Sequence, residues 1–259
     1  YVFSRKRAMA MSLIGIVLGI AFFIVTQAQT SGFQNFFIET ILGINGAIKI
    51  SDRFQDLDGT VSKTSSTGEF TFNLKSREHL KYFEGVDYPE KIRKALNQFN
   101  SISGISEVIE SNGILSTKSR NQTVQIFGIE VDEHIKVSNL RDQLRAGSIN
   151  KFSGDQMGIL IGQKIADRMK ISIDDRINLA GKTESFQLRV SGIFETGVSE
   201  IDKKRIYIPL TTCRTLNGKR FGGSNFQIGL INPNKAPEIA LQIQETIGHR
   251  AVSWQEREK

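Results

Sequence analysis

Residues 4–29, SRKRAMAMSLIGIVLGIAFFIVTQAQ, decide how the rest of the chain is organised. The basic triplet Arg5, Lys6 and Arg7 precedes 18 uncharged residues, from Ala8 to Val25. As an α-helix this run spans about 27 Å, close to the roughly 30 Å of hydrocarbon in a bilayer. The stretch therefore predicts one membrane helix. The positive-inside rule places its basic start in the cytoplasm and the large remaining domain across the membrane.

A secretory signal peptide is the alternative for this stretch, with Thr26-Gln27-Ala28 as a weak cleavage site. Apolar cores of signal peptides span about 7–15 residues, and this core is longer. Phe33, Phe36, Phe37 and Ile41 then recur at helical spacing, which predicts that the helix continues out of the bilayer. We therefore favour a retained helix with a periplasmic extension.

Three small residues, Ser12, Gly15 and Gly19, lie on one side of the predicted membrane helix. Small residues spaced in this way let two helix backbones approach closely in lipid. They predict that the helix packs against membrane neighbours. The alternative is that glycine is simply common in membrane helices.

The composition is that of a folded protein, with 39% hydrophobic and 24% charged residues among 259. The net charge of +7 is spread along the chain in short runs such as Lys203-Lys204-Arg205, so nucleic-acid binding is disfavoured. The single cysteine, Cys213, has no intramolecular partner for a disulfide. Because the chain begins at Tyr1 rather than Met, we expect it to be a fragment.

Apolar periodicity and turn residues predict an α+β fold after the membrane helix. Gly43 and Gly46 are expected to end that helix. The predicted strands are 47–51, 69–74, 105–116, 123–131, 157–161, 176–179, 186–194, 205–209, 225–231 and 250–254. The predicted helices are 88–99, 162–169, 210–216 and 236–247. Because the last strand-helix-strand resembles the first part, the middle block is interpreted as an insertion. The expected domains are the helix and its extension (1–43), a membrane-proximal lobe (44–134 plus 221–259) and an inserted lobe (135–220).

Four motifs recur in an order that resembles one known family: GILIGQKIADRM at 158–169, IDDRINL at 173–179, VSGIFETG at 190–197 followed by EID at 200–202, and SWQER at 253–257. In these motifs the chain resembles the periplasmic region of the MacB/FtsX-like ABC permeases, most closely the lipoprotein-releasing LolC/LolE type. The resemblance runs over most of the chain.

The resemblance implies a bacterial inner-membrane protein with a two-lobed periplasmic domain, a porter-like lobe and an inserted sabre lobe, followed in the family by three further membrane helices. It implies no catalysis and no cofactor in this chain, because ATP binds a separate cytoplasmic ATPase subunit. The other implied partners are a second permease subunit, identical or different, and a lipoprotein or similar amphiphilic cargo.

Two departures from the family pattern affect what can be transferred. LolC-type members carry a long hairpin arm that recruits a periplasmic carrier, whereas here only 180–185 join Leu179 to Phe186. Carrier docking through such an arm is therefore not expected. Asp174 also replaces the family's glycine before the next aspartate.

Two groups of residues are candidates for binding. Phe33, Phe36, Phe37 and Ile41 would line an entry cavity and contact acyl chains; the alternative is packing against the chain's own domain or partner helices. Glu200 and Asp202 would form a partner-facing turn; the alternative is a solvated turn.

Other chemistry is not indicated. His79, His134 and His249 lack the spacing of metal ligands, and no nucleophile, carboxylate pair or phosphate loop is recognisable. The leading hypothesis is therefore a transport subunit without an ATPase site. The alternatives are an FtsX-like scaffold that regulates a cell-wall hydrolase, a MacB-like efflux permease for another substrate and, least favoured, a membrane-tethered enzyme.

Overall fold

The structure, a computed structural model, describes residues 2–53, 86, 89–218 and 224–257. The predicted strand at 69–74 and His79 lie outside these residues. The chain divides into two compact units, Tyr1–Ile41 and Leu42–Lys259, which are described separately.

The first unit is formed by helix α1 (Val2–Asn45), which continues for its last turn into the second unit. The predicted continuous helix is confirmed. Among the described residues, one helix is long and apolar enough to cross a membrane, Met9–Asn45, which contains an 18-residue window with a mean hydropathy of 2.5. Three threonines in it donate their hydroxyls to the carbonyl one turn earlier (Thr26, Thr30, Thr40), which satisfies these polar groups within the helix.

Helix α1 ends at Asn45 because Gly46 takes a left-handed conformation, with φ of +68°. The Gly46 N–H donates to the Leu42 carbonyl at 3.0 Å, which closes the last turn. The prediction that glycine ends the helix is therefore confirmed at Gly46 and wrong at Gly43, which lies inside the helix.

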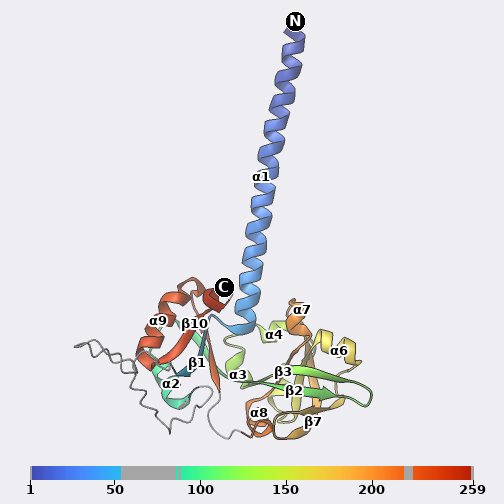
Figure 1. Ribbon diagram of the computed structural model, residues 1–259, viewed down its shortest axis with the longest axis vertical. Helices are drawn as coiled ribbons and strands as arrows, with labels where there is room; N and C mark the ends of the chain where they lie inside the picture. The colour runs from blue at the N-terminus through green and yellow to red at the C-terminus, as the bar shows by residue number, and fades with distance from the viewer. Residues whose placement is uncertain (1, 54–85, 87–88, 219–223, 258–259) are drawn as a thin grey trace, which may run out of the picture. The chain divides into compact units, whose positions relative to one another are not determined.

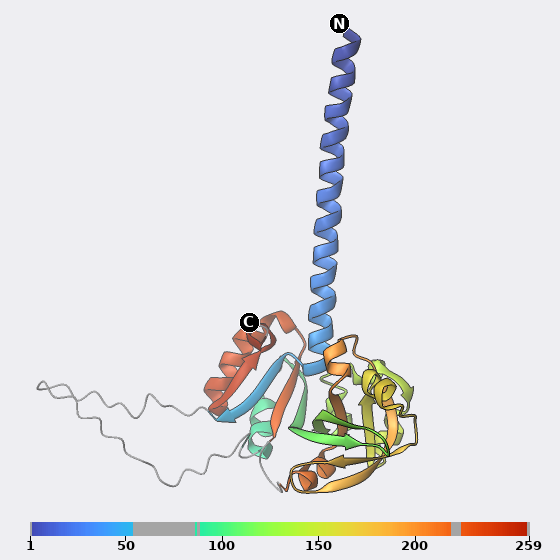
Figure 2. The ribbon, with the colours of Figure 1, turned by 45° about the vertical axis from the view of Figure 1, so that its right-hand side comes forward.

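The second unit is built on one ten-stranded sheet with the order β10-β1-β9-β2-β3-β8-β5-β7-β4, in which β6 also pairs with β2 and β7 (Figure 1). Most pairs are antiparallel, and β3–β8 and β5–β7 are parallel. The strands are β1 (Ile48–Arg53), β2 (Ile102–Ser116), β3 (Asn121–Ile129), β4 (Leu144–Gly147), β5 (Gly158–Gly162), β6 (Arg176–Ala180), β7 (Ser185–Phe194), β8 (Arg205–Pro209), β9 (Asn225–Leu230) and β10 (His249–Ser253). Figure 2 shows β1 and β10 side by side.

Short helices connect and cover the strands. They are α2 (Pro89–Leu96), α3 (Val131–His134), α4 (Leu140–Gln143), α5 (Ile149–Ser153), α6 (Gln163–Met169), α7 (Ser199–Asp202), α8 (Leu210–Leu216), the 3₁₀ helix η2 (Pro233–Lys235), α9 (Ala236–Ile247) and α10 (Trp254–Arg257). The mixed helix and sheet content confirms the predicted α+β fold with an apolar N-terminal helix.

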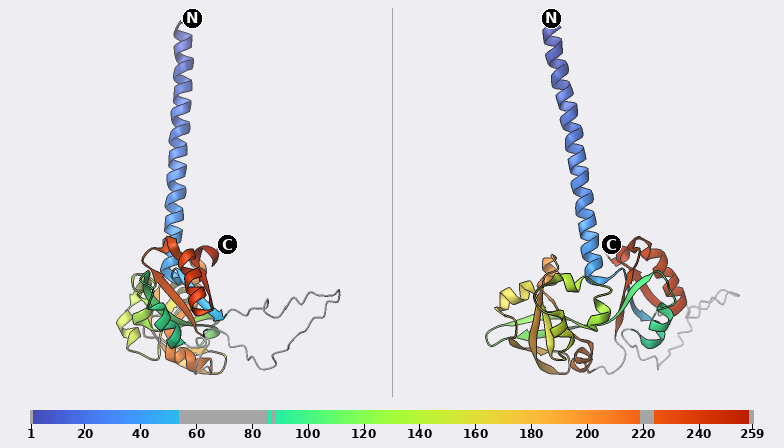
Figure 3. Two further views of the ribbon diagram at one scale, coloured as in Figure 1. Left: turned by 90° about the vertical axis from the view of Figure 1, so that its left-hand side faces the viewer. Right: turned by 180° about the vertical axis from the view of Figure 1, so that it is seen from behind.

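The hydrophobic core of the described residues separates into clusters. The elements that carry these clusters form two lobes (Figure 3). In the first lobe, Ile48 of β1, Phe226 of β9 and Ile243 of α9 are buried in one cluster. Strand β10 and helix α2 also contribute side chains to this cluster. In the second lobe, two clusters gather residues of β3 to β8 with α5, α6 and α8. Burial of such side chains supplies the main driving force for each lobe.

Strand β2 belongs to both lobes. Its first half, Ile102 to Val108, pairs with β9, and its second half, Val108 to Ser116, pairs with β3. Strand β3 pairs in turn with β8 of the second lobe. The predicted domain limits at 134/135 and 220/221 stay a prediction, and β3, placed with the first lobe by that division, packs in the second-lobe core.

Candidate functional site

The six residues Leu42–Ala47 at the end of α1 are held by several separate segments, and we call this segment the socket. The Gly43 carbonyl accepts from the Asn139 N–H at 2.7 Å. The Ala47 N–H donates to the Ile228 carbonyl at 2.8 Å, and its carbonyl accepts from the Trp254 N–H at 2.9 Å. The end of the helix is thereby fastened to the α3–α4 loop, to β9 and to α10.

Two arginines from distant parts of the chain complete the socket. Arg205 of β8 donates to the Asn45 side-chain oxygen at 3.1 Å, and Arg257 of α10 donates to the Gly46 carbonyl at 2.8 Å. The last turn of α1 contains no basic residue of its own. Cations near a helix C-terminus interact favourably with its partial negative charge. Arg205 and Arg257 supply these cations, one from the second lobe and one from the segment after β10.

Arg205 is itself buried among aromatic rings. Its guanidinium lies 4.0 Å from the centre of the Phe127 ring and donates to the Tyr207 hydroxyl at 3.3 Å. A cation over an aromatic face is attracted by the negative charge of that face. These contacts fix the direction in which Arg205 reaches Asn45.

His134 of α3 lies beside this group and is fully buried. Its Nδ1 is 3.0 Å from the Ser106 hydroxyl, and its ring centre is 5.6 Å from that of Tyr207. Burial, with a smaller contribution from the charge of Arg205, lowers the pKa of His134 to about 3. The imidazole is therefore neutral in the folded chain at neutral pH.

The neutral His134 makes stability depend on pH. Its pKa is lowered on folding, so the unfolded chain binds the proton first, and stability is lost as pH falls below 6.5. From pH 7.5 to 5 the free energy of unfolding is expected to fall by about 2 kcal/mol from this residue alone. Urea unfolding of the parent and of the His134→Gln variant at these two pH values measures the contribution as a difference. An equal pH dependence in both proteins would contradict it.

The MacB-like periplasmic core domain matches residues 9–246 of this chain. The chain belongs to this family. Curated relatives include the lipoprotein-releasing system transmembrane proteins LolC of Xylella fastidiosa (strain Temecula1), 25% identical over 74% of this chain and 42% of the relative, and LolE of Haemophilus influenzae, 24% identical over 65% and 34%. The chain spans less than half the length of these curated relatives.

Solved structures with a similar fold include the periplasmic region of MacB from Actinobacillus actinomycetemcomitans, 14% identical, with a TM-score of 0.49 over 84% of this chain and 92% of that one. A second is the extracellular domain of the noncanonic ABC-type transporter YknZ from Gram-positive bacteria, 13% identical, with a TM-score of 0.47 over 64% and 88%.

In this MacB-like chain the connection between β6 and β7 is a tight turn. The Gly181 N–H donates to the Glu184 carbonyl at 2.9 Å, and β7 begins at the next residue. A Cβ on Gly181 would meet the Leu216 side chain at 2.4 Å, so the turn packs closely against α8. The connection is as short as the sequence predicts.

The two carboxylates of the predicted partner-facing turn, Glu200 and Asp202, lie in different surroundings. Glu200 is exposed and ion-paired with Lys203, and this hydrogen bond lowers the pKa of Glu200. Asp202 is only 2% exposed, and one of its oxygens accepts from the Thr196 N–H at 2.9 Å and the Thr196 hydroxyl at 2.8 Å. A partner-facing role for the Asp202 side chain is therefore wrong, and such a role for Glu200 stays a prediction.

The predicted residues on α1 are mostly exposed. Phe33, Phe36 and Phe37 are 66%, 60% and 44% exposed, with the Phe33 and Phe37 rings stacked at 6.2 Å, whereas Ile41 is buried. Added Cβ atoms at Gly15 and Gly19 would meet nothing within 4 Å, and Ser12 is exposed. Helix packing through these small residues stays a prediction.

Within the described residues no group of three His, Cys, Asp or Glu side chains gathers as metal ligands would. Cys213 is buried, and burial raises its pKa to about 11, so it is a thiol and a poor nucleophile at neutral pH. The socket arginines are not predictable from the sequence, because the glycine that ends the helix is visible locally, whereas Arg205 and Arg257 contact the socket from 160 and 211 residues away.

Proposed function

We propose that this chain is the first membrane span and periplasmic domain of an ABC transporter permease that releases lipoproteins or similar amphiphiles from the bacterial inner membrane. The match to the MacB-like periplasmic core domain carries this proposal, and the similarity to LolC and LolE supports the cargo class. In the proposal a separate cytoplasmic ATPase subunit supplies the energy, and a second permease subunit completes the complex.

The socket gives the proposed permease a way to pass motion from membrane to periplasm. Helix α1 continues without a break into Leu42–Asn45, and the socket is bonded to residues of both lobes. A rotation or shift of the helix end would therefore have to move β8 and β9 with it or break these bonds. Packed elements of this kind transmit displacement rather than absorb it.

The exposed phenylalanines of α1 are the proposed surface for the acyl chains of the cargo. Phe33, Phe36 and Phe37 lie 8, 11 and 12 residues beyond Val25, the last residue of the predicted membrane run, and are 66%, 60% and 44% exposed. Covering apolar area stabilises a complex by about 25 cal/mol per Å². In the proposal, an acyl chain that leaves the bilayer binds to this face.

The test is a double variant, Phe36→Asp with Phe37→Asp, in the full permease reconstituted with its ATPase subunit in liposomes. We expect ATP-driven cargo release to fall at least about tenfold, because charged side chains lose the apolar contact and a tenfold change corresponds to about 1.4 kcal/mol. Gln34→Asp with Asn35→Asp is the matched control, since it places the same charges at neighbouring exposed positions. Unchanged release in a complex that still copurifies with the ATPase would refute the cargo surface.

The short turn between β6 and β7 favours a second candidate, a permease that acts without a carrier-docking arm: an FtsX-like scaffold or a MacB-like efflux permease. Photo-crosslinking from an exposed position of the second lobe, such as Lys164, separates the candidates. A captured lipidated protein supports lipoprotein release, and a captured cell-wall hydrolase supports the scaffold.

A further inference from the structure

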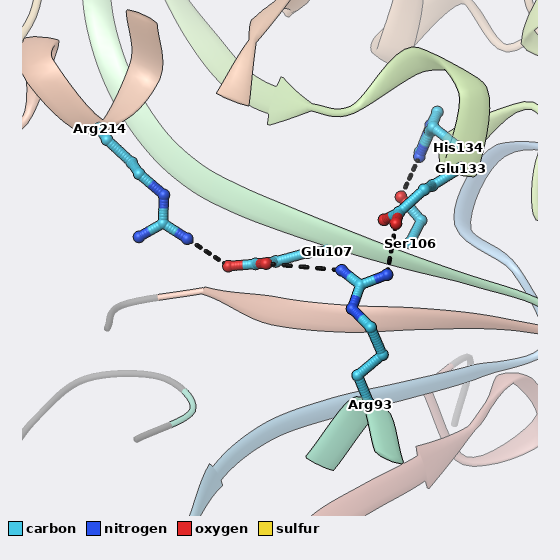
Figure 4. Close-up of polar contacts among 6 residues, drawn as sticks. All are labelled: Arg93, Ser106, Glu107, Glu133, His134 and Arg214. Carbon is cyan, nitrogen blue, oxygen red and sulfur yellow. Dashed lines mark hydrogen bonds and ion pairs between the residues drawn. The ribbon is translucent and has the colours of Figure 1, made fainter. Parts of the chain in front are cut away.

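A chain of alternating charges crosses the junction between the two lobes (Figure 4). Glu107 of β2 is ion-paired with Arg214 of α8 and lies 3.7 Å from a guanidinium nitrogen of Arg93 of α2. Arg93 is in turn ion-paired with Glu133 of α3. The order Arg214, Glu107, Arg93, Glu133 contains two positive and two negative side chains, so each charge faces an opposite one.

The two arginines of this row of charges come from helices that pack in different hydrophobic clusters. Helix α2 is fixed in the first lobe by Ile92 and Leu96, and α8 is fixed in the second lobe by Cys213 and Leu216. Arg93 and Arg214 therefore reach the same carboxylate from opposite lobes. The contact joins elements that share no hydrophobic cluster.

Glu107 lies at the point where β2 passes from one lobe to the other. The next residue, Val108, pairs with Asn225 of β9 in the first lobe and with Ile129 of β3 in the second. A bend between the lobes would be concentrated at this residue, because on each side of it the strand is held by a different partner. An ion pair that spans this point therefore restrains the angle between the two lobes directly.

A second ion pair, Lys49 with Glu110 at 2.7 Å, also links β1 to the second half of β2. Its side chains are 26% and 31% exposed, whereas the Glu107 side chain is 8% exposed. Solvent screens an exposed pair and leaves a buried one strong. Among the carboxylates of these ion pairs, Glu107 is therefore less screened by solvent than Glu110 and Glu133, whose side chains are 31% and 28% exposed.

We propose that Glu107 is a latch that holds the two lobes in one relative arrangement through Arg93 and Arg214. Loss of its charge frees the lobes to move about β2. The latch does not depend on the cargo, so it stands or falls separately from the proposed function.

The test is a distance measurement between spin labels on the full chain in detergent micelles. Labels are placed at Leu241→Cys on α9 of the first lobe and Lys164→Cys on α6 of the second, both exposed positions, while Cys213 is fully buried. Double electron–electron resonance of this parent is expected to give one narrow distance distribution. A chain without the two added cysteines controls for labelling of Cys213.

Glu107→Gln and Arg214→Gln are each expected to widen the distribution at least about twofold or to shift its mean. Glu195→Gln is the matched control, because its pair with Arg145 at 2.9 Å lies within the second lobe; it should match the parent. Arg214→Gln keeps Glu107 paired with Arg93, so it tests the latch even where Glu107→Gln fails to fold. Distributions that match the Glu195→Gln control in folded Arg214→Gln protein overturn the proposal.

Discussion

Gly46→Ala in the full chain is expected to lower the free energy of unfolding of the two-lobed domain by about 3 kcal/mol. The left-handed backbone at φ of +68° costs a residue with a Cβ about 1–2 kcal/mol. That Cβ would also lie 2.7 Å from a Val137 methyl group and 2.9 Å from the Ile228 carbonyl oxygen. Overpacking of this kind costs roughly 1–3 kcal/mol more, since β9 and the α3–α4 region must move apart.

Gly248→Ala is the matched control for Gly46→Ala. Gly248 also follows the last residue of a helix, has φ of +63° and donates its N–H to the carbonyl four residues earlier. An added Cβ there would meet nothing within 4 Å, so the variant carries only the backbone cost of about 1–2 kcal/mol.

The measurement is urea unfolding followed by tryptophan fluorescence. The chain has a single tryptophan, Trp254, whose backbone N–H donates to the Ala47 carbonyl of the socket. Its signal therefore reports on the segment that Gly46 positions. Should Gly46→Ala lose no more stability than Gly248→Ala, close packing of the socket around Gly46 would be disproved.

The sequence predicts the regular elements of this chain well where the apolar pattern is regular and its ends are marked. Helix α1 follows from its uncharged run, and β8, α8 and α9 begin and end where the apolar pattern and Pro209 place them. Strand β2 starts at Ile102, three residues before its prediction, because its first residues alternate weakly and are held by pairing with β9.

The elements that the sequence pattern does not predict are short and depend on tertiary contacts. Helices α3, α4, α5 and α7 have four or five residues each, too few to show a helical period. Strand β4 has four residues and exists through its pairing with β7.

The long-range polar contacts are harder to predict from the sequence than the short helices and strands. The Arg214–Glu107 pair joins residues 107 positions apart, and Arg205 reaches Asn45 across 160. In the sequence Arg205 belongs to a basic run, whereas the fold buries its side chain against Phe127 and Tyr207. The sheet order, which places β8 two strands from β2, brings α8 and its Arg214 close to Glu107 of β2.

Asp202→Ala is expected to lower the free energy of unfolding by about 3 kcal/mol. One Asp202 oxygen accepts both the N–H and the hydroxyl of Thr196 in a buried turn, and each hydrogen bond to a charged group is worth roughly 1.5–3 kcal/mol. Asp202→Asn keeps an oxygen at that position and should cost clearly less. The same fluorescence-detected urea unfolding measures both variants.

Glu200→Ala is the counterpart of Asp202→Ala, two residues away in the same turn. The Glu200 carboxylate is exposed and forms ion pairs with Lys203 and Lys204, so its loss should leave the unfolding transition in place. If the turn faces a partner subunit, Glu200→Ala weakens copurification of that subunit while the domain stays folded. Equal unfolding of Asp202→Ala and Glu200→Ala would contradict the division of this turn into an inward structural carboxylate and an outward one.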